Sequence, residues 1–399
     1  MLTSLALIFL CAMSLNYIFQ KIKLPGIIGM LITGIVLGPY ALNLIDGQIL
    51  AISSELRKLS LIVILTRAGL ALDLEDLKKV GRPAILLSFI PATFELAAVM
   101  IFAPMFFGIP LIEAAIMGCV LAAVSPAVIV PRMLKLMKEG YGKERSIPQL
   151  IMAAASVDDI YVIVLFASFL GAFSGENLSL VSLIKVPISI VLGIILGAVS
   201  GYALVLFFKK FHMKDTVKVI VLFCVSFLFI TLEDALSGIV PISGLLAVMA
   251  AGVTILKTYP VLAHRLQSKF SKIWVAAELM LFVLVGAAVD LTYASGISAM
   301  VFVLLGAALA FRLVGVFLSL LGTPLSTKEK IFCLFSYIPK ATVQAAIGAI
   351  PLAAGVPSGN LILTVAVLAI FVTAPLGAFG IDLSYKKLLS SPPEETAAL

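Results

Sequence analysis

Long apolar runs follow one another along almost all of this 399-residue chain, with only short polar loops between them. A lipid-spanning helix needs about 20 predominantly apolar residues, because the bilayer interior offers the backbone no hydrogen-bond partners. Apolar residues make up 62% of the chain and charged residues 12%, with a mean hydropathy of +1.20. Soluble proteins carry about 25% charged residues. We therefore predict an all-α polytopic membrane protein without a soluble domain.

The runs predict about 13 transmembrane helices. They are expected near residues 3–20, 24–45, 56–73, 83–107, 111–137, 147–173, 180–208, 216–233, 241–256, 272–290, 295–321, 328–352 and 358–381.

Basic residues gather in every second loop, and this pattern predicts an orientation. Loops after odd-numbered predicted helices carry most of the 28 lysines and arginines, whereas the alternate loops are short and neutral or acidic, as in SGEN at 174–177. Because basic loops remain on the cytoplasmic side, we expect a multi-pass protein of the inner (plasma) membrane with its N-terminus outside and its C-terminus in the cytoplasm. The net charge of +7 then requires no nucleic-acid partner.

The two halves of the chain resemble each other at an offset of 217 residues. IVILTRAGLALDL at 62–74 matches LMLFVLVGAAVDL at 279–291, and Gly34 matches Gly252 at nearly the same offset. The third and tenth helices, which carry the two motifs, cross the membrane in opposite directions. We therefore predict an inverted repeat of helices 1–6 and 8–13, with helix 7 as the connector.

The offset also relates two charged residues inside the predicted spans. Glu95, midway along the fourth helix, maps onto Arg312, midway along the eleventh. Opposite charges at symmetry-equivalent positions can meet near the pseudo-twofold axis, so we expect a structural Glu95–Arg312 ion pair that joins the repeats rather than binding substrate. For Arg67 and Glu278, pairing with each other and separate solvation in a cavity remain equal alternatives.

Prolines interrupt two of the predicted helices. The fifth reads IMGCVLAAVSPAVIVPRMLKL and contains Pro126, whereas the twelfth reads FSYIPKATVQAAIGAIPL and contains Pro339. A proline inside a helix frees a carbonyl group and breaks the hydrogen-bond ladder. Within a membrane such breaks persist where they face protein or water, and paired discontinuous helices in two repeats build ion sites. We therefore predict that helices 5 and 12 are broken and cross each other.

Adjacent aspartates lie near the middle of the sixth helix. Each ionised residue there costs about 2.5–3.5 kcal/mol on insertion scales, and no structural benefit compensates for Asp158 and Asp159 together. Burial and mutual repulsion both disfavour two negative charges, so the pair is expected to hold protons that a cation can replace. Ser125 and Ser156 can add hydroxyl oxygens for a hard cation. Lys340, directly after the break in helix 12, is the expected counter-charge of Asp158.

Four stretches carry a resemblance to a known family: TRAGLALDL, SVDDI, FRLVGV and PKATVQAAIG. They resemble the cation/proton antiporter superfamily, its aspartate-pair branch, and in detail the NHA-type sodium/proton exchangers and their bacterial relatives. The resemblance implies a secondary transporter rather than an enzyme, without a cofactor, in which Na⁺ or Li⁺ and protons compete at Asp159 beside Asp158. It also implies alternating access, a role in pH homeostasis and a homodimer.

The resemblance further implies a division of the chain into a core and a dimerisation domain. The expected parts are dimerisation-domain helices 1–3 in 1–82, core helices 4–6 in 83–173, the connecting helix 7 in 174–208, dimerisation-domain helices 8–10 in 209–294, core helices 11–13 in 295–382 and a cytoplasmic tail in 383–399.

One residue departs from the family pattern and leaves the stoichiometry open. Bacterial members of the branch usually carry a lysine where this chain has Arg312, and an arginine does not deprotonate in proteins. Either Lys340 takes over that role or exchange is electroneutral. A K⁺/H⁺ antiporter and a sodium-coupled symporter of an organic solute remain the alternative functions, and the sequence does not choose between Na⁺, Li⁺ and K⁺.

Overall fold

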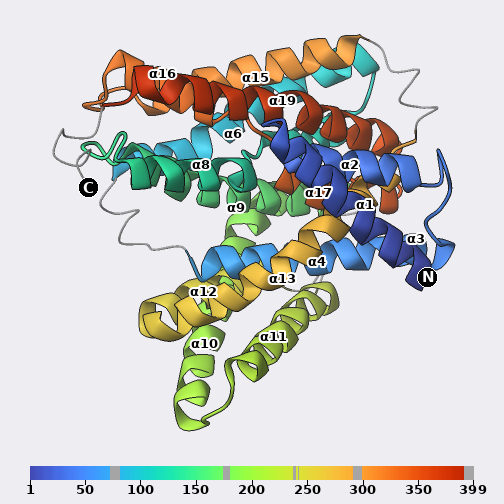
Figure 1. Ribbon diagram of the computed structural model, residues 1–399, viewed down its shortest axis with the longest axis vertical. Coiled ribbons are helices and arrows are strands. Elements are labelled where there is room, and N and C mark those ends of the chain that lie inside the picture. The colour runs from blue at the N-terminus through green and yellow to red at the C-terminus, as the bar shows by residue number, and fades with distance from the viewer. Residues whose placement is uncertain (72–80, 174–179, 237–239, 241, 291–298, 391–399) are drawn as a thin grey trace. The chain divides into compact units, whose positions relative to one another are not determined.

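The computed structural model describes residues 1–71, 81–173, 180–236, 240, 242–290 and 299–390, and all regular structure within them is helical (Figure 1). Among these residues, nine helices are long and apolar enough to cross a membrane, and three shorter apolar helices accompany them. The chain is thus a polytopic helical membrane protein. Leu72, Asp73, Leu74 and Leu291 of the repeat motifs and the last nine residues of the predicted tail lie outside the described residues.

The chain divides into two compact units. The first unit comprises Met1–Leu50, Glu75–Phe166 and Phe282–Leu399. The second unit comprises Ala51–Leu74 and Ala167–Leu281. Two of the boundaries fall inside long helices, α9 (Ile147–Phe173) and α13 (Pro260–Ala287), which contribute to both units.

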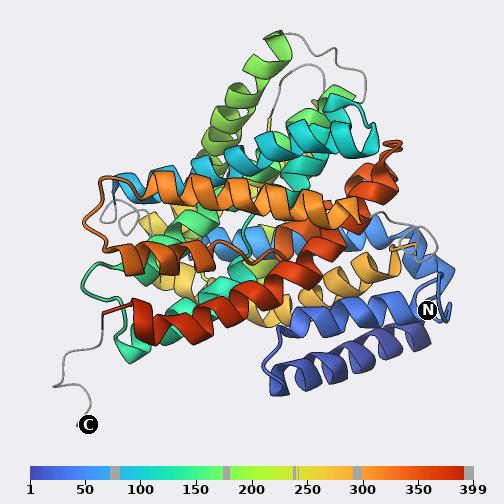
Figure 2. The ribbon, with the colours of Figure 1, turned by 90° about the horizontal axis from the view of Figure 1, so that it is seen from above.

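The first unit contains most of the helices. They are α1 (Leu2–Lys21), α2 (Gly26–Leu37), α3 (Gly47–Ala51), α6 (Arg82–Phe107), α7 (Leu111–Ala122), α8 (Pro126–Glu139), the first part of α9, the end of α13, α15 (Met300–Ser319), α16 (Thr327–Ser336), α17 (Thr342–Ile347), α18 (Ile350–Ala353) and α19 (Gly359–Leu388). Helix α1 pairs with α2, α6 packs along α15, and α19 lies against α16 and α18 (Figure 2).

The second unit is built around α12 (Gly244–Thr258). This helix lies between α4 (Ser53–Gly69), α10 (Leu180–Lys210) and α11 (Asp215–Ala235). Small residues allow the close approach, as in other membrane helix pairs. A Cβ atom added at Gly201 of α10, for example, would lie 2.7 Å from the carbonyl oxygen of Ala251 in α12.

Two helix boundaries differ from the predicted ones for identifiable reasons. Helix α13 begins at Pro260, ahead of the predicted start at 272, because proline is well accommodated in the first turn and the charged residues that follow continue the helix beyond its apolar part. Helix α2 ends at Leu37, well before the predicted 45, because Pro39 disfavours helical geometry at Gly38, which is extended (ψ 174°).

The distribution of polarity is the reverse of that in a soluble protein. Glu95, Asp158 and Arg312 are completely buried, whereas Leu2 is 82% exposed and Leu383 76% exposed. Apolar surface of this kind is stable when lipid covers it, and buried charges in such proteins face the interior of the bundle. The buried charges are therefore candidates for a functional role.

Candidate functional site

Two broken helices lie at the centre of the first unit. Helix α7 ends at Ala122, the chain is extended at Ala123 (ψ 143°) and Ser125 (ψ 109°), and α8 begins with Pro126. Helix α16 ends at Ser336 and α17 starts at Thr342, with Pro339 in the irregular segment between them. Both interruptions occur at the prolines that the sequence singled out.

The two breaks contact each other. The backbone N–H of Ser125 donates to the carbonyl oxygen of Pro339 at 2.8 Å. The hydroxyl oxygens of Ser125 and Thr342 lie 3.4 Å apart, and the side-chain amide of Gln344 donates to the carbonyl oxygen of Ala123 at 2.8 Å. Backbone groups freed by one interruption are thus satisfied by the other, which a water-poor interior requires.

Arg312 of α15 connects four parts of this centre. Its guanidinium donates to Glu95 of α6 and to Asp158 of α9, each at 3.0 Å. It also donates to the carbonyl oxygens of Tyr337, at 3.0 Å, and Ala122, which belong to the two breaks. A planar guanidinium with five N–H donors suits such multiple contacts. The structure therefore brings Glu95 and Arg312 together and adds Asp158 to the pair.

Lys340 lies on the other side of Glu95. Its ammonium is 2.6 Å and 2.7 Å from the two carboxylate oxygens of Glu95 and donates to the carbonyl oxygen of Leu121 at 2.6 Å. This differs from the expectation that Lys340 directly neutralises Asp158. Arg312 takes that place, because its longer fork reaches both carboxylates while the lysine ammonium is held by Glu95.

The two aspartates of the pair have different surroundings. Asp158 is fully buried, and its Oδ2 accepts from Arg312 and from the backbone N–H of Val124 at 2.9 Å. The Oδ1 atoms of Asp158 and Asp159 are buried and have no hydrogen-bond partner in the part of the chain that the structure describes. Ser156 lies in α9, but its side chain is outside the described part.

Formal charges at the centre nearly cancel. Arg312 and Lys340 supply two positive charges, and Glu95 and Asp158 supply two negative ones. The four side chains therefore form a neutral cluster, which we call the buried tetrad. Asp159 is the remaining carboxylate, adjacent to the buried tetrad but not neutralised within it.

Some groups at this centre were not predicted from the sequence. Gln344 donates to the carbonyl oxygen of Ala123 at the first break. In the buried tetrad, Arg312 donates to the carbonyl oxygen of Tyr337, and Asp158 accepts from the backbone N–H of Val124. Gln344 could have been noticed as a polar residue in an otherwise apolar run. The backbone groups carry no sequence signal, because any residue supplies them.

Two further features involve none of these residues. In the second unit, the guanidinium of Arg67 lies 5.3 Å from the ring centroid of Trp274. Trp274 precedes Glu278 by one turn of α13.

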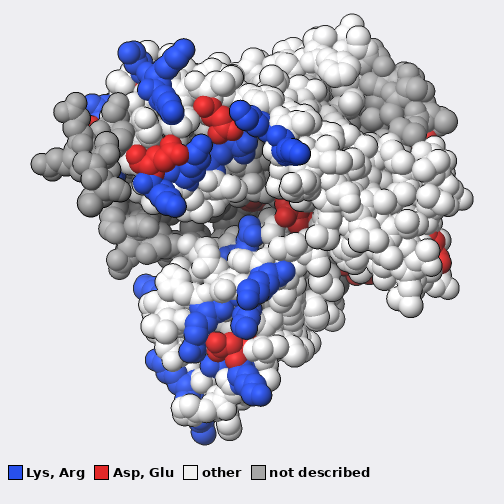
Figure 3. Space-filling view, in the orientation of Figure 1, with Lys and Arg blue, Asp and Glu red and all other residues white. Residues whose placement is uncertain are grey.

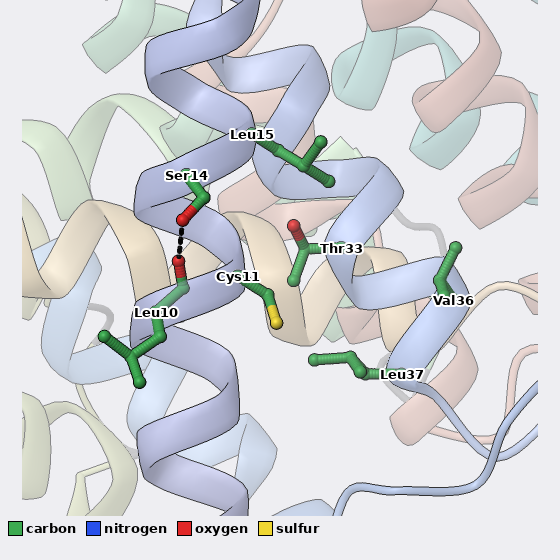
Figure 4. Close-up of a pocket in the computed structure, with 7 residues that line it drawn as sticks. All are labelled: Leu10, Cys11, Ser14, Leu15, Thr33, Val36 and Leu37. Atoms are coloured by element: carbon green, nitrogen blue, oxygen red, sulfur yellow. Dashed lines mark hydrogen bonds between the residues drawn. The ribbon is translucent and has the colours of Figure 1, made fainter.

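In the first unit, α1 and α2 border a cavity of about 350 Å³ (Figure 4). Its hydroxyl groups bind their own helices, with Ser14 donating to Leu10 at 2.7 Å and Thr33 to Gly29 at 2.9 Å. The cavity is therefore an apolar groove rather than an ion site.

Comparison with known proteins agrees with this architecture. The profile of the family described as "Sodium/hydrogen exchanger, transmembrane" matches residues 5–383. The chain is 31% identical to human sodium/hydrogen exchanger 9B2, over 97% of this chain and 75% of the relative. It is 34% identical to human sodium/hydrogen exchanger 9B1, over 98% of this chain and 78% of the relative.

A solved structure has the same fold. The sodium proton antiporter MjNhaP1 of Methanocaldococcus jannaschii superimposes with a TM-score of 0.83 at 21% identity, covering 97% of this chain and 98% of that one. At this identity the likeness concerns the fold alone, whereas the family profile covers almost the whole sequence. The chain therefore belongs to the sodium/hydrogen exchanger family.

Proposed function

We propose that this protein is a secondary transporter that exchanges Na⁺ or Li⁺ for protons by alternating access. The observation that carries the proposal is the charge arrangement: the buried tetrad is neutral, and Asp159 stands next to it with a buried, unpaired Oδ1. An isolated buried carboxylate is costly, so it binds either a proton or a cation. Competition between these two ligands at one carboxylate is the basis of antiport.

Candidate oxygen ligands for a cation are present on α9 and at the break before α8. Asp159 and Asp158 offer their unpaired Oδ1 atoms, and Ser125, fully buried at the break before α8, offers a hydroxyl oxygen. Hard cations such as Na⁺ prefer oxygen ligands. Asp159 would carry the cation's counter-charge, and Asp158 and Ser125 would complete the site; Ser156 remains a candidate ligand.

Contacts between the two halves support the proposed inverted repeat. Three hydrogen bonds join residues that are 217 positions apart, namely Ser60 to Ala277, Ser125 to Thr342 and Arg312 to Glu95. A pseudo-twofold axis that relates residue i to residue i + 217 brings such equivalent residues together.

Glycine contacts point the same way. Added Cβ atoms at Gly34 and Gly286 would strike each other's helices, and those at Gly252 and Gly69 would do the same in the second unit. Each contact is the repeat-related counterpart of the other. We propose 13 transmembrane helices with the repeat and the domain division expected from the sequence, in a homodimer of the plasma membrane with the N-terminus outside.

The decisive experiment measures proton flux in proteoliposomes with a pH-sensitive dye and an imposed ΔpH. Na⁺, Li⁺ and K⁺ are added in turn to wild type, to Asp159→Asn and to Asp382→Asn, a control carboxylate on α19 that pairs with Arg132 at 3.2 Å and is 42% exposed. We expect Na⁺ or Li⁺ to restore the dye signal in wild type and control and not in Asp159→Asn. A response to K⁺ alone would indicate the K⁺/H⁺ alternative. No response to any cation from folded protein would refute antiport and favour the symporter.

A further inference from the structure

A second charged site lies wholly within the second unit. An open pocket of about 830 Å³ lies between the end of α10, the start of α11 and the first part of α13. Most of its lining side chains are polar or charged. They are Lys209, His212, Lys214, Asp215, Thr216, Lys218, Tyr259, Arg265 and Lys269, together with Phe208 and Met213.

The pocket carries a strong excess of positive charge. Five lysine and arginine side chains line it against the single carboxylate of Asp215. Over the α10–α13 region, Figure 3 shows basic side chains gathered around one acidic group. The positive-inside pattern explains why such residues occur in this loop. It does not explain why residues from three helices converge on one cavity.

The internal contacts of the pocket hold its cations in place without neutralising them. Asp215 is shared between Arg265, at 3.2 Å, and Lys218, at 3.7 Å, so one negative charge is divided between two positive ones. The side chain of Lys218 is only 8% exposed, and the ammonium of Lys209 lies 5.4 Å from the ring centroid of Tyr259. These cations are preorganised, which lowers the entropy lost when an anion binds.

The start of α11 adds to the same field. The 21-residue helix begins at Asp215, and its first residues line the pocket, so the positive end of its dipole points there. Basic side chains together with the N-terminal end of a long helix make a binding site for phosphate groups.

Apolar side chains next to the pocket place it at the surface of the membrane. Phe207 and Phe211 at the end of α10 are 40% and 48% exposed, with ring centroids 4.9 Å apart, and Ile220 of α11 is 57% exposed. Exposed phenylalanine and isoleucine side chains are stable where lipid covers them, and lysine and arginine side chains near the ends of such helices extend to the level of the headgroups. An anion in this pocket would therefore lie beside lipid.

We propose that this pocket binds a phosphate-bearing anion, with the headgroup of an anionic membrane lipid as the source that its position fits. Basic pockets between membrane helices bind such headgroups, and each nearby lysine or arginine adds to the attraction. The pocket shares no residue with the buried tetrad, and the proposal does not depend on which cation the protein transports.

Thermal unfolding of the full-length protein in an uncharged detergent tests the proposal. The midpoint Tm is followed while phosphatidylglycerol, phosphatidylcholine or pyrophosphate is added to wild type and to two double variants. Lys214→Gln/Lys269→Gln removes two charges from the pocket. Lys386→Gln/Lys387→Gln removes two exposed charges at the end of α19 and serves as the matched control.

Phosphatidylglycerol should raise the Tm of wild type and of the control at the same lipid concentration, and phosphatidylcholine should not. The pocket variant should need about 30-fold more phosphatidylglycerol for the same shift. If it fails to fold, the single Lys214→Gln should need about fivefold more. A pyrophosphate shift that the pocket variant loses would assign the site to soluble phosphates as well, whereas no pyrophosphate shift would restrict it to lipid. Equal responses of the pocket variant and the control, or equal effects of the two lipids, would overturn the proposal.

Discussion

Glu95 and Arg312 are separated by 217 positions in the chain, yet their side chains meet at 3.0 Å in the interior of the first unit. The same number of positions separates the two motifs that suggested an internal repeat. An ion pair between symmetry-equivalent residues is what a pseudo-twofold axis through the core would produce. The pair does not stand alone, because Lys340 extends it on one side and Asp158 on the other.

The buried tetrad leads to a first prediction about stability. Glu95→Gln leaves Lys340 as a buried, uncompensated cation, and breaking such a pair destabilises by about 3–5 kcal/mol. Lys340→Gln leaves one net negative charge in the tetrad, because Arg312 alone then faces Glu95 and Asp158. The double variant Glu95→Gln/Lys340→Gln retains the neutral pair of Arg312 and Asp158, so it should be more stable than the sum of the single losses implies.

Unfolding midpoints of the four proteins in detergent give the coupling between these two residues. Glu55→Gln serves as the control, because this carboxylate is 69% exposed and 3.5 Å from Lys58. We expect that control to unfold within a degree or two of wild type, as exposed ion pairs contribute about 0–1 kcal/mol. Purely additive losses from Glu95→Gln and Lys340→Gln would show that the two side chains do not act as a pair.

A second prediction concerns the charge moved in each transport cycle. Arg312 does not lose its proton and contacts Asp158 at 3.0 Å, so under the proposed function Asp159 alone exchanges one proton for one monovalent cation. Exchange should then be electroneutral. Rates measured in proteoliposomes at 0 mV and at 100 mV, set with valinomycin and K⁺, should be equal.

Electrogenic exchange, the alternative, would instead make transport strongly dependent on voltage. Movement of one net charge through 100 mV would change the equilibrium gradient by about 50-fold. Such voltage dependence would mean that a second group, with Lys340 the candidate, releases a proton during the cycle. Measuring Arg312→Lys in parallel tests the cause, because a lysine at this position can lose its proton whereas the native arginine does not.

The sequence predicted the parts of this molecule that depend on composition and spacing. Apolar length marks the membrane helices, and prolines mark the breaks at Pro126 and Pro339. The separation of 217 residues, visible in the repeated motif, also brought Glu95 and Arg312 together. These signals are strong because lipid forbids unsatisfied backbone groups and therefore limits where helices can break.

Other features depended on three-dimensional geometry that no spacing reveals. Lys340 was expected to neutralise Asp158. In the structure Arg312 contacts Asp158 and Lys340 contacts Glu95, because the reach of each cationic side chain decides which carboxylate it meets. The start of α13 at Pro260 was not predicted, because residues 260–271 carry charged side chains and apolar length marks only the apolar part of a helix. Contacts of Arg312 with the carbonyl oxygen of Tyr337 arise from backbone geometry alone.

A third prediction addresses the packing of α19 on the break between α16 and α17. A Cβ atom at Gly377 would lie 2.8 Å from the backbone nitrogen of Pro339 and closer still to its ring, so Gly377→Ala should displace the break. We expect a lower Tm and reduced exchange in proteoliposomes. Gly306→Ala is the matched control, since a Cβ atom there meets nothing within 4 Å. An alanine at an open helical site stabilises by up to about 1 kcal/mol, so a Gly377→Ala protein that behaves like Gly306→Ala would contradict this account.

The fourth prediction concerns a contact between α7 and the start of α19. The carboxylate of Glu113, which is 4% exposed, accepts hydrogen bonds from the hydroxyl of Ser358 and from its backbone N–H, the latter at 2.9 Å. Glu329, at the corresponding third position of α16, accepts from Arg145 at 2.8 Å, just before α9. The first turn of each broken helix thus secures the start of a long helix.

Removing this acceptor should matter more than removing the hydroxyl. Glu113→Ala leaves the backbone N–H of Ser358 without a partner in a part-buried place, and an unsatisfied group of that kind costs about 1–3 kcal/mol. Ser358→Ala retains the N–H bond to Glu113 and should lower the Tm less. Once Glu113 is absent, Ser358→Ala should have little further effect, so the double variant should match Glu113→Ala. Full additivity of the two losses would mean that Glu113 stabilises α7 locally and does not hold the start of α19.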